Sequence, residues 1–219
     1  YSYLTSASFS ARYSPGGFVF DVAGSSLFPK EVLLVLSVMN SPYAGYALKL
    51  INPTVNFQIG DVARLPMIRD SSSLLESLTE QAIMHSHTLD LKKESTYDFI
   101  VPPRWSTGFN DLATTESRLV DLESKINGEV YRLYGISDID RAAIEVELAG
   151  ESLPTDEDEI EAILNDEDDS DIEPPMDREE LAVRWISYAL GIVLGRFQPG
   201  VLGALGCAVC CREDFAVGS

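Results

Sequence analysis

The sequence predicts an α+β fold, in which a small β-sheet with packed short helices is followed by a mostly helical extension. Two observations predict the sheet. Apolar and polar side chains alternate over Thr54–Ile59, which is the two-residue period of a half-buried strand. Ser14–Gly17 places Pro and Gly at the second and third positions of a type II turn, between the β-like residues 9–13 and 18–22. Apolar residues that recur at steps of three and four over 112–133 predict the helical extension.

Two short helices are expected to pack on this sheet. Pro29 suits the first position of one helix, which ends at Asn40–Pro42. Ser41 can cap the next helix, which ends at Asn52–Pro53. Both segments are strongly apolar, so each needs a surface on which to bury its side chains.

The strand at Thr54–Ile59 is expected to end at Gly60-Asp61. A short edge segment then follows at Leu65–Ile68, because proline cannot donate to a ladder. On the strand, Asn56 and Gln58 share the polar face.

Helices account for the remaining predicted elements. Ser73 and Glu76 form a capping-box pattern at the start of a helix that reaches about Thr88. An irregular excursion over 97–109 precedes a long amphipathic helix. The apolar residues of that long helix are Leu112, Leu119, Leu122, Ile126, Val130 and Leu133.

Two more helices and a set of domain boundaries complete the prediction. Ser137 can cap one helix, and Asp177–Glu180 open another whose body is Leu181–Phe197. The predicted domains are a β-rich core at 1–69, a helical extension at 70–150, an acidic linker at 151–175 and an apolar helical segment at 176–219.

The formal net charge of −19 is distributed unevenly. Residues 151–173 hold twelve acidic side chains and no basic one, whereas residues 1–69 hold five basic and three acidic side chains. A high negative charge argues against nucleic acid, which proteins bind by neutralising phosphates, but the first third of the chain escapes this objection. The acidic run is expected to be a solvated linker, with a partner-binding tail and a metal site as the alternatives.

The histidines and cysteines predict no metal site. His85 and His87 are two residues apart, so on a helix they face different directions. Cys207, Cys210 and Cys211 have the first half of a zinc spacing without a second pair of ligands, so buried thiols are favoured. An odd, clustered set of cysteines favours a reducing interior, and the expected location is therefore cytoplasmic.

The apolar segment at 181–211 is not expected to interact with a membrane. Arg184 and Arg196 interrupt it, whereas a spanning helix needs about 20 uninterrupted residues. The segment is expected to pack on protein outside this chain. The chain begins at Tyr1 without an initiator Met or a signal peptide, so it is expected to be a piece of a longer protein.

No catalytic residue is expected in this segment. Gly16-Gly17 has neither the spacing nor the lysine of a phosphate-binding loop, and no serine lies in a nucleophile elbow. Asp90 and Lys92 match the end of a metal-dependent nuclease pattern, but no suitably placed carboxylate precedes them.

One stretch resembles a known family. Leu48–Pro66, with the sequence LKLINPTVNFQIGDVARLP, is similar to the specificity region of large restriction–modification methyltransferases, the type IIG enzymes and the PglX-like proteins of BREX phage defence. Arg12–Asp21, Ile126–Ile136 and Trp185–Arg196 also match, so the resemblance covers most of the chain outside the acidic run.

The resemblance implies a recognition fragment of an adenine-specific DNA methyltransferase. In that family an amino-terminal domain methylates the exocyclic amine of adenine with S-adenosylmethionine, and a carboxy-terminal domain similar to half of a type I specificity subunit recognises the duplex sequence. The catalytic Asn-Pro-Pro-Tyr loop is absent here, because Asn52–Thr54 lacks the second proline and the aromatic ring, and Val101–Arg104 lacks the leading Asn or Asp. The cofactor motif is missing too, so S-adenosylmethionine is implied only for a missing catalytic domain, which is an expected partner together with double-stranded DNA.

Eight residues are the candidates for DNA binding. Asn56 and Gln58 carry amides suited to bidentate contact with adenine. Arg104 could reach a groove from its excursion. The candidates for phosphate contacts are Arg12, Lys30, Lys49, Arg64 and Arg69.

Several alternatives remain open at this point. Asn56 and Gln58 could instead satisfy backbone groups near Gly60, and the basic residues could be ordinary solvated surface. The chain as a whole could be an acidic protein-interaction or DNA-mimic module, or, against the missing motifs, a complete small enzyme.

Overall fold

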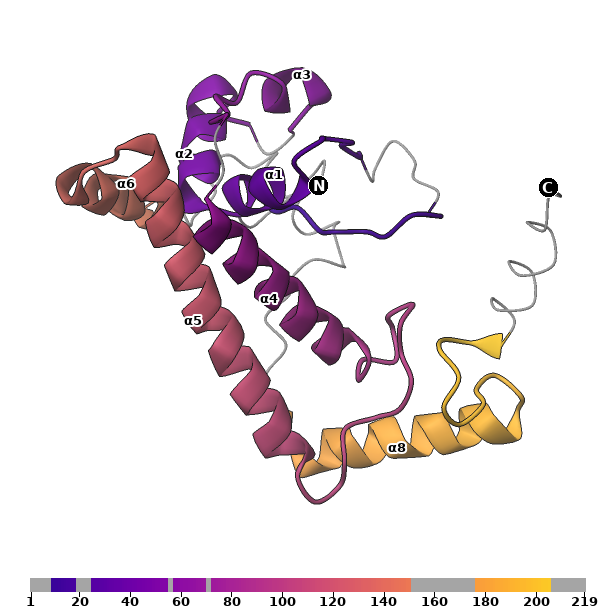
Figure 1. Cartoon of the computed structure of the whole chain (residues 1–219). Helices are drawn as coiled ribbons and strands as arrows, with labels where there is room; N and C mark the ends of the chain where they lie inside the picture. The colour runs from indigo at the N-terminus through magenta and orange to yellow at the C-terminus, as the bar shows by residue number, and fades with distance from the viewer. Residues whose placement is uncertain (1–8, 19–24, 55–56, 70–71, 151–175, 206–219) are drawn as a thin grey trace, which may run out of the picture. The chain divides into compact units, whose positions relative to one another are not determined.

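The described part of the chain is helical. The computed structural model describes residues 9–18, 25–54, 57–69, 72–150 and 176–205 (Figure 1). These residues form the α-helices α1 (Val32–Met39), α2 (Pro42–Ile51), α3 (Ile59–Val62), α4 (Ser73–Asp90), α5 (Gly108–Tyr134), α6 (Asp138–Gly150) and α8 (Arg178–Val193). They contain no strand, so the predicted α+β fold with a small sheet is wrong.

The predicted strand at Thr54–Ile59 is replaced by the start of a helix. Val55 and Asn56 lie outside the described residues, and Ile59 begins α3. The Asp61 carboxylate accepts a hydrogen bond from the Gln58 N–H over 3.2 Å, as a capping box requires at a helix start. Local capping therefore prevails over the alternating pattern.

The predicted hairpin is also not formed over the residues that are described. Residues 9–15 have no regular secondary structure. The Asn40 side chain pairs with Ala11 as a neighbouring strand would: its Oδ1 accepts from the Ala11 N–H, and its Nδ2 donates to the Ala11 carbonyl, each at 2.9 Å. One side chain thus satisfies the backbone groups that the prediction assigned to a ladder. A turn is present, but its positive φ of +103° is at Gly17 and not at Gly16, where a type II turn over Ser14–Gly17 needs it. Residues 19–22 of the second strand lie outside the description.

Most of the predicted helices are confirmed. Ser41 caps α2 and Asp177 caps α8, since their side chains accept from the N–H groups of Ala44 and Glu180. Ser137 caps α6 in the same way.

Two predicted helix starts are displaced. The cap of α4 is Ser72 rather than Ser73, because the Ser72 Oγ accepts from the Leu75 N–H over 3.0 Å. The first helix begins at Val32, after Glu31, so Pro29 lies outside it.

The described residues belong to two compact units. The first unit is Tyr1–Gln81 with Leu122–Ile172, and the second is Ala82–Asp121 with Glu173–Ser219. The four predicted domains stay predictions, and the acidic run lies outside the described residues.

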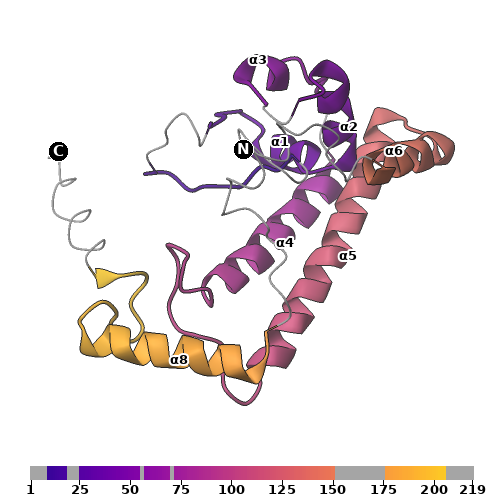
Figure 2. The ribbon, with the colours of Figure 1, turned by 180° about the vertical axis from the view of Figure 1, so that it is seen from behind.

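In the first unit, α1, α2 and α3 gather near the beginning of α4, the end of α5 and α6 (Figures 1 and 2). α2 packs against α1, α3 and α6. The side chains that are completely enclosed here include Val38, Leu48, Leu75 and Val130. Because α2 and α5 contribute to one core, residues far apart in the sequence are held together.

In the second unit, the irregular segment at 91–107 packs on one face of α8. Phe99 lies against Tyr188 and Phe197, with ring centroids 5.7 and 5.3 Å away. The indole N–H of Trp185 donates to the Pro103 carbonyl over 2.9 Å. The excursion is irregular as predicted, but its Phe99 and Pro102 are fully buried, and Phe99 forms the core of this unit with Tyr188 and Phe197.

Tyr131 offers a test of the first core. Its side chain is 4% exposed, and its hydroxyl has no hydrogen-bond partner among the described residues. We expect Tyr131→Phe to leave the free energy of unfolding unchanged or to raise it by about 1 kcal/mol, since an unsatisfied buried hydroxyl is removed. Thermal unfolding against the wild type measures this. A loss of stability above roughly 1 kcal/mol would show that the hydroxyl has a partner.

Candidate nucleic-acid interface

Four of the predicted DNA-binding residues lie on one segment of the first unit. This α2–α3 segment, residues 48–69, carries Lys49, Gln58, Arg64 and Arg69. Gln58, Arg64 and Arg69 are exposed, while Lys49 is half-buried. Since three of the four side chains reach solvent, the segment can present positive charge and an amide to a partner.

The middle of the α2–α3 segment is held by an asparagine–aspartate pair. The Asn52 Nδ2 donates to the Asp61 Oδ2 over 2.8 Å, and the same oxygen accepts from the Gln58 N–H. The Asn52 Oδ1 accepts from the hydroxyl of Thr54 over 2.8 Å and from its N–H over 3.1 Å. Asn52 thus connects the end of α2 with the start of α3. In the predicted recognition region, this Asn-Pro-Thr sequence has a structural role.

The end of the α2–α3 segment is held by two tyrosines. The Tyr134 hydroxyl, at the end of α5, donates to the Pro66 carbonyl over 2.7 Å. The Tyr43 hydroxyl, in the first turn of α2, donates to the same oxygen over 3.4 Å. The two rings are tilted by 34° with centroids 3.9 Å apart. Burial, aided by neighbouring Tyr43, raises the pKa of Tyr134 to about 12, so its hydroxyl remains a donor at neutral pH.

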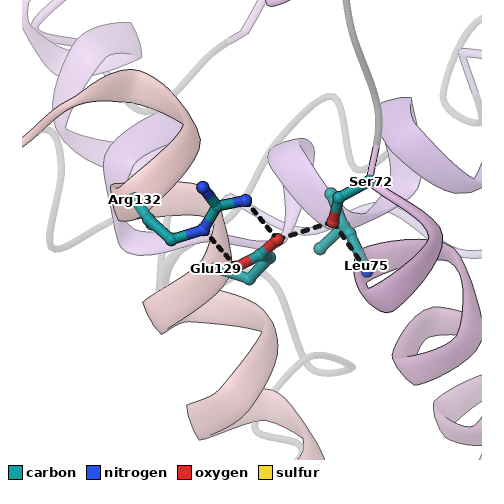
Figure 3. Close-up of polar contacts among 4 residues, drawn as sticks. All are labelled: Ser72, Leu75, Glu129 and Arg132. Atoms are coloured by element: carbon teal, nitrogen blue, oxygen red, sulfur yellow. Dashed lines mark hydrogen bonds and ion pairs between the residues drawn. The ribbon is translucent and has the colours of Figure 1, made fainter.

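A buried carboxylate joins α5 to the start of α4 (Figure 3). Arg132 donates from Nε and Nη2 to the two oxygens of Glu129, each over 2.7 Å. The Ser72 hydroxyl donates to Glu129 over 2.6 Å while it caps α4 at Leu75. The hydrogen bonds from Arg132 are the main cause that lowers the pKa of Glu129 to about 2; burial opposes them, and Ser72 adds to them. Glu129 is therefore ionised at every pH near neutrality.

Three of the remaining predicted DNA-binding residues lie elsewhere in the described chain. Arg12 and Lys30 are exposed on separate stretches of the first unit. Arg104 is exposed in the second unit, between buried Pro103, whose carbonyl accepts from Trp185, and exposed Trp105. Asn56 lies outside the described residues.

Sequence reasoning missed the residues that hold the interface. Nothing in the sequence singles out Tyr43, and Glu129 and Tyr134 fall only within the stretch Ile126–Ile136 that carries the resemblance. The signal was present, since a glutamate within an otherwise apolar helix seam marks a buried polar group that needs partners.

The described residues supply no metal centre. His, Cys, Asp and Glu side chains do not gather there into a group of three or more that could hold an ion. The Nε2 atom of His87 lies 3.4 Å from the Oδ2 atom of Asp98. The cysteines at 207–211 fall outside the described residues. In the same part of the chain, no helix combines the length and the apolar character needed to cross a membrane.

Two known proteins match the chain. The adenine-specific methyltransferase BrxX of Escherichia coli O9:H4 (strain HS) is 28% identical over 210 residues, a match that covers 89% of this chain and 17% of that protein. The adenine-specific methyltransferase PglX of Lacticaseibacillus casei (strain Zhang) is 40% identical over 89 residues, which is 39% of this chain and 7% of that protein. The chain is similar to adenine-specific methyltransferases.

This similarity confirms the methyltransferase side of the predicted resemblance. The chain spans only a small part of either relative, 17% and 7% of their lengths, so the adenine-specific methyltransferase activity in those names is that of the whole relatives. No protein-family model matches the chain. Its role as a carboxy-terminal specificity region stays a prediction.

Proposed function

We propose that this chain is a DNA target recognition segment of an adenine-specific methyltransferase from a restriction–modification or phage-defence system. Its own residues recognise duplex DNA, and a methyltransferase domain of the same protein supplies S-adenosylmethionine chemistry. The observation that supports this most is the α2–α3 segment, which presents Gln58, Arg64 and Arg69 to solvent while its backbone is held at two points. Similarity to BrxX over 89% of the chain supports the methyltransferase context.

Each exposed residue has a distinct role in this proposal. Arg64 and Arg69 contact phosphates, which adds affinity for any sequence. Gln58 reaches a base edge, where a side-chain amide can bond the N6 and N7 atoms of adenine. Asn56, Lys49, Arg12, Lys30 and Arg104 are further contacts of the same proposal.

The exposed face of α8 supports a second partner, the methyltransferase domain. Val183, Ile186, Leu190 and Val193 follow one another at steps of three and four residues and are 56–82% exposed. The opposite face of α8 already packs on Phe99. A helix that is apolar on both faces is typical of one that packs on protein at both faces.

DNA binding is tested with labelled duplex and the full chain. We expect binding that is at best about micromolar and falls steeply with salt. Changing Arg64 and Arg69 together to Gln should reduce the slope of log K against log salt by about 2, since each phosphate contact contributes about 0.9. Arg118→Gln, which removes an exposed charge from α5 outside the segment, is the matched control and should leave most of the slope intact.

Further variants separate recognition from the acidic-module alternative. Gln58→Ala should change the preference among duplex sequences more than the affinity for a random one. Deleting residues 151–173, which hold twelve acidic side chains, should strengthen DNA binding. If neither chain binds any duplex at about 50 mM salt, and only the undeleted chain captures a basic DNA-binding protein, the acidic-module alternative replaces this proposal.

A further inference from the structure

The Pro66 carbonyl oxygen is where two distant parts of the first unit meet the α2–α3 segment. It accepts from the hydroxyl of Tyr134, 68 residues away, and from that of Tyr43, 23 residues away. A carbonyl oxygen has two lone pairs, so both hydroxyls can be accommodated. Proline has no N–H of its own, which leaves this carbonyl as the only backbone hydrogen-bonding group of the residue.

Residues 66–68 lie in no helix, so few other groups determine their position. α3 and its last turn end by Leu65, whose side chain is buried. Pro66 and Met67 are exposed. The path of the backbone from Arg64 to Arg69 therefore depends on buried Leu65, on half-buried Ile68 and on the two tyrosines.

Both tyrosines are built as rigid anchors. Their rings lie against each other with centroids 3.9 Å apart. Each residue belongs to a helix, Tyr43 to α2 and Tyr134 to α5. A tyrosine has few side-chain torsions, so a packed ring holds its hydroxyl at a defined place. A hydrogen bond from the Ile68 backbone lowers the pKa of Tyr134, against the larger effect of burial.

We propose that Tyr43 and Tyr134 are positioning residues that fix the backbone at Pro66, and so hold Arg64 and Arg69 where both can meet phosphates of a DNA duplex. This inference rests on the proposed function, because it assigns the two arginines to DNA. The tyrosines do not touch the duplex. They act through Pro66, so their loss allows the segment to move and lets each arginine search more orientations before it meets a phosphate.

The test uses Tyr43→Phe, Tyr134→Phe and the pair, in the full chain, with a random labelled duplex. Each change keeps the ring and removes only the hydroxyl. For the pair we expect a three- to tenfold weaker affinity for the duplex, because the less ordered arginines would lose more conformational freedom on binding. The slope of log K against log salt should fall toward that of the Arg64→Gln, Arg69→Gln chain. Tyr131→Phe, one helical turn away on α5, is the matched control and should bind as the wild type does.

A double-mutant cycle excludes a merely structural role. In a chain that already carries Arg64→Gln and Arg69→Gln, removing the tyrosine hydroxyls should have no further effect on DNA affinity. If the tyrosines only support the fold, the affinity should fall by the same factor in both backgrounds, and the inference is then wrong.

Amide hydrogen exchange gives a second measurement that needs no DNA. The N–H groups of Met67, Ile68 and Arg69 should exchange faster in the Tyr43→Phe, Tyr134→Phe chain, while those in the middle of α5 keep their rates. Unchanged exchange at 67–69 would overturn the positioning role even if a variant lost affinity for another reason. Single Tyr43→Phe, which removes the longer bond, serves if the pair does not fold.

The outcomes separate this inference from the proposed function. If the wild type binds duplex with a steep salt dependence and the tyrosine variants match it, only the inference fails. If the wild type binds no duplex at about 50 mM salt, the proposed function fails and the inference fails with it.

Discussion

Gly191→Ala is expected to destabilise the second unit by about 1–3 kcal/mol, although alanine is the better helix former. A Cβ at this position of α8 would lie 2.4 Å from Cδ2 and 2.8 Å from Cε2 of Phe197. The Phe197 ring cannot easily move away, because it is 5% exposed and packs on Phe99 and Tyr188. The backbones of the two residues are also close together, because the Phe197 N–H donates to the Gly191 carbonyl over 3.2 Å.

Glycines elsewhere in the helices supply the control. Gly45 in α2 and Gly128 in α5 have open space where a Cβ would be added. Gly45→Ala and Gly128→Ala should therefore raise the free energy of unfolding by roughly 0.5–1 kcal/mol, the ordinary helix-propensity gain. Urea unfolding followed by circular dichroism measures all three changes. Phe197→Leu should recover part of the loss in the Gly191→Ala chain, and a stabilised Gly191→Ala chain would mean that the Phe197 ring does not pack against α8.

Glu129→Gln is expected to lower the free energy of unfolding at neutral pH by about 2 kcal/mol. Glutamine keeps the shape of the side chain but loses the charge that two nitrogens of Arg132 share. It also weakens the acceptor for the Ser72 hydroxyl, which caps α4. The beginning of α4 should therefore become less stable together with the end of α5.

The effect of Glu129 depends on pH in a defined direction. Its pKa falls from the ordinary 4.5 to about 2 in the folded protein, so the unfolded chain binds the proton more readily. The stabilisation is present above the unfolded pKa and is lost as the pH falls toward the folded pKa. Between about pH 5 and pH 2, the wild type should lose roughly 2–3 kcal/mol more than Glu129→Gln does.

An exposed glutamate–arginine pair is the matched control for Glu129. Glu145 on α6 accepts from the Arg141 Nε over 2.8 Å, but its side chain is 48% exposed. Glu145→Gln should change stability by less than about 0.5 kcal/mol, because solvent screens such pairs. Equal effects of the two substitutions would contradict the claim that enclosure makes the Glu129 network important.

Local sequence signals determined most of the helices and three of their starts, whereas the last helix ends at Val193 and not at the predicted Phe197. Ser41, Ser137 and Asp177 were predicted as helix starts from residue type and position, and each one caps its helix. The long helix α5 was predicted from its apolar repeat, and Leu122, Ile126 and Val130 are buried as expected. These signals succeed because capping and amphipathic periodicity depend on residues within one turn of each other.

The same local reasoning failed for the sheet. The alternation at Thr54–Ile59 is a weak signal over so few residues, and the carboxylate of Asp61 favours a helix start instead. At residues 9–13, a strand needs a partner, and the partner of Ala11 is the side chain of Asn40, 29 residues away. Whether a β-like segment joins a ladder depends on what lies beside it, which no local pattern specifies.

The sequence by itself predicted the candidates for DNA contacts, and only the tertiary structure decided which of them lie on a segment that side chains of distant helices hold. Lys49, Gln58, Arg64 and Arg69 could be chosen from residue type alone. Their support could not, because Pro66 is held by Tyr134, which is 68 residues away, and Ser72 is held by Glu129, which is 57 residues away. Such contacts form only when α2, the start of α4 and the end of α5 bury their apolar faces together. The hydrogen bonds then follow, because the packing brings buried polar groups together and these need partners.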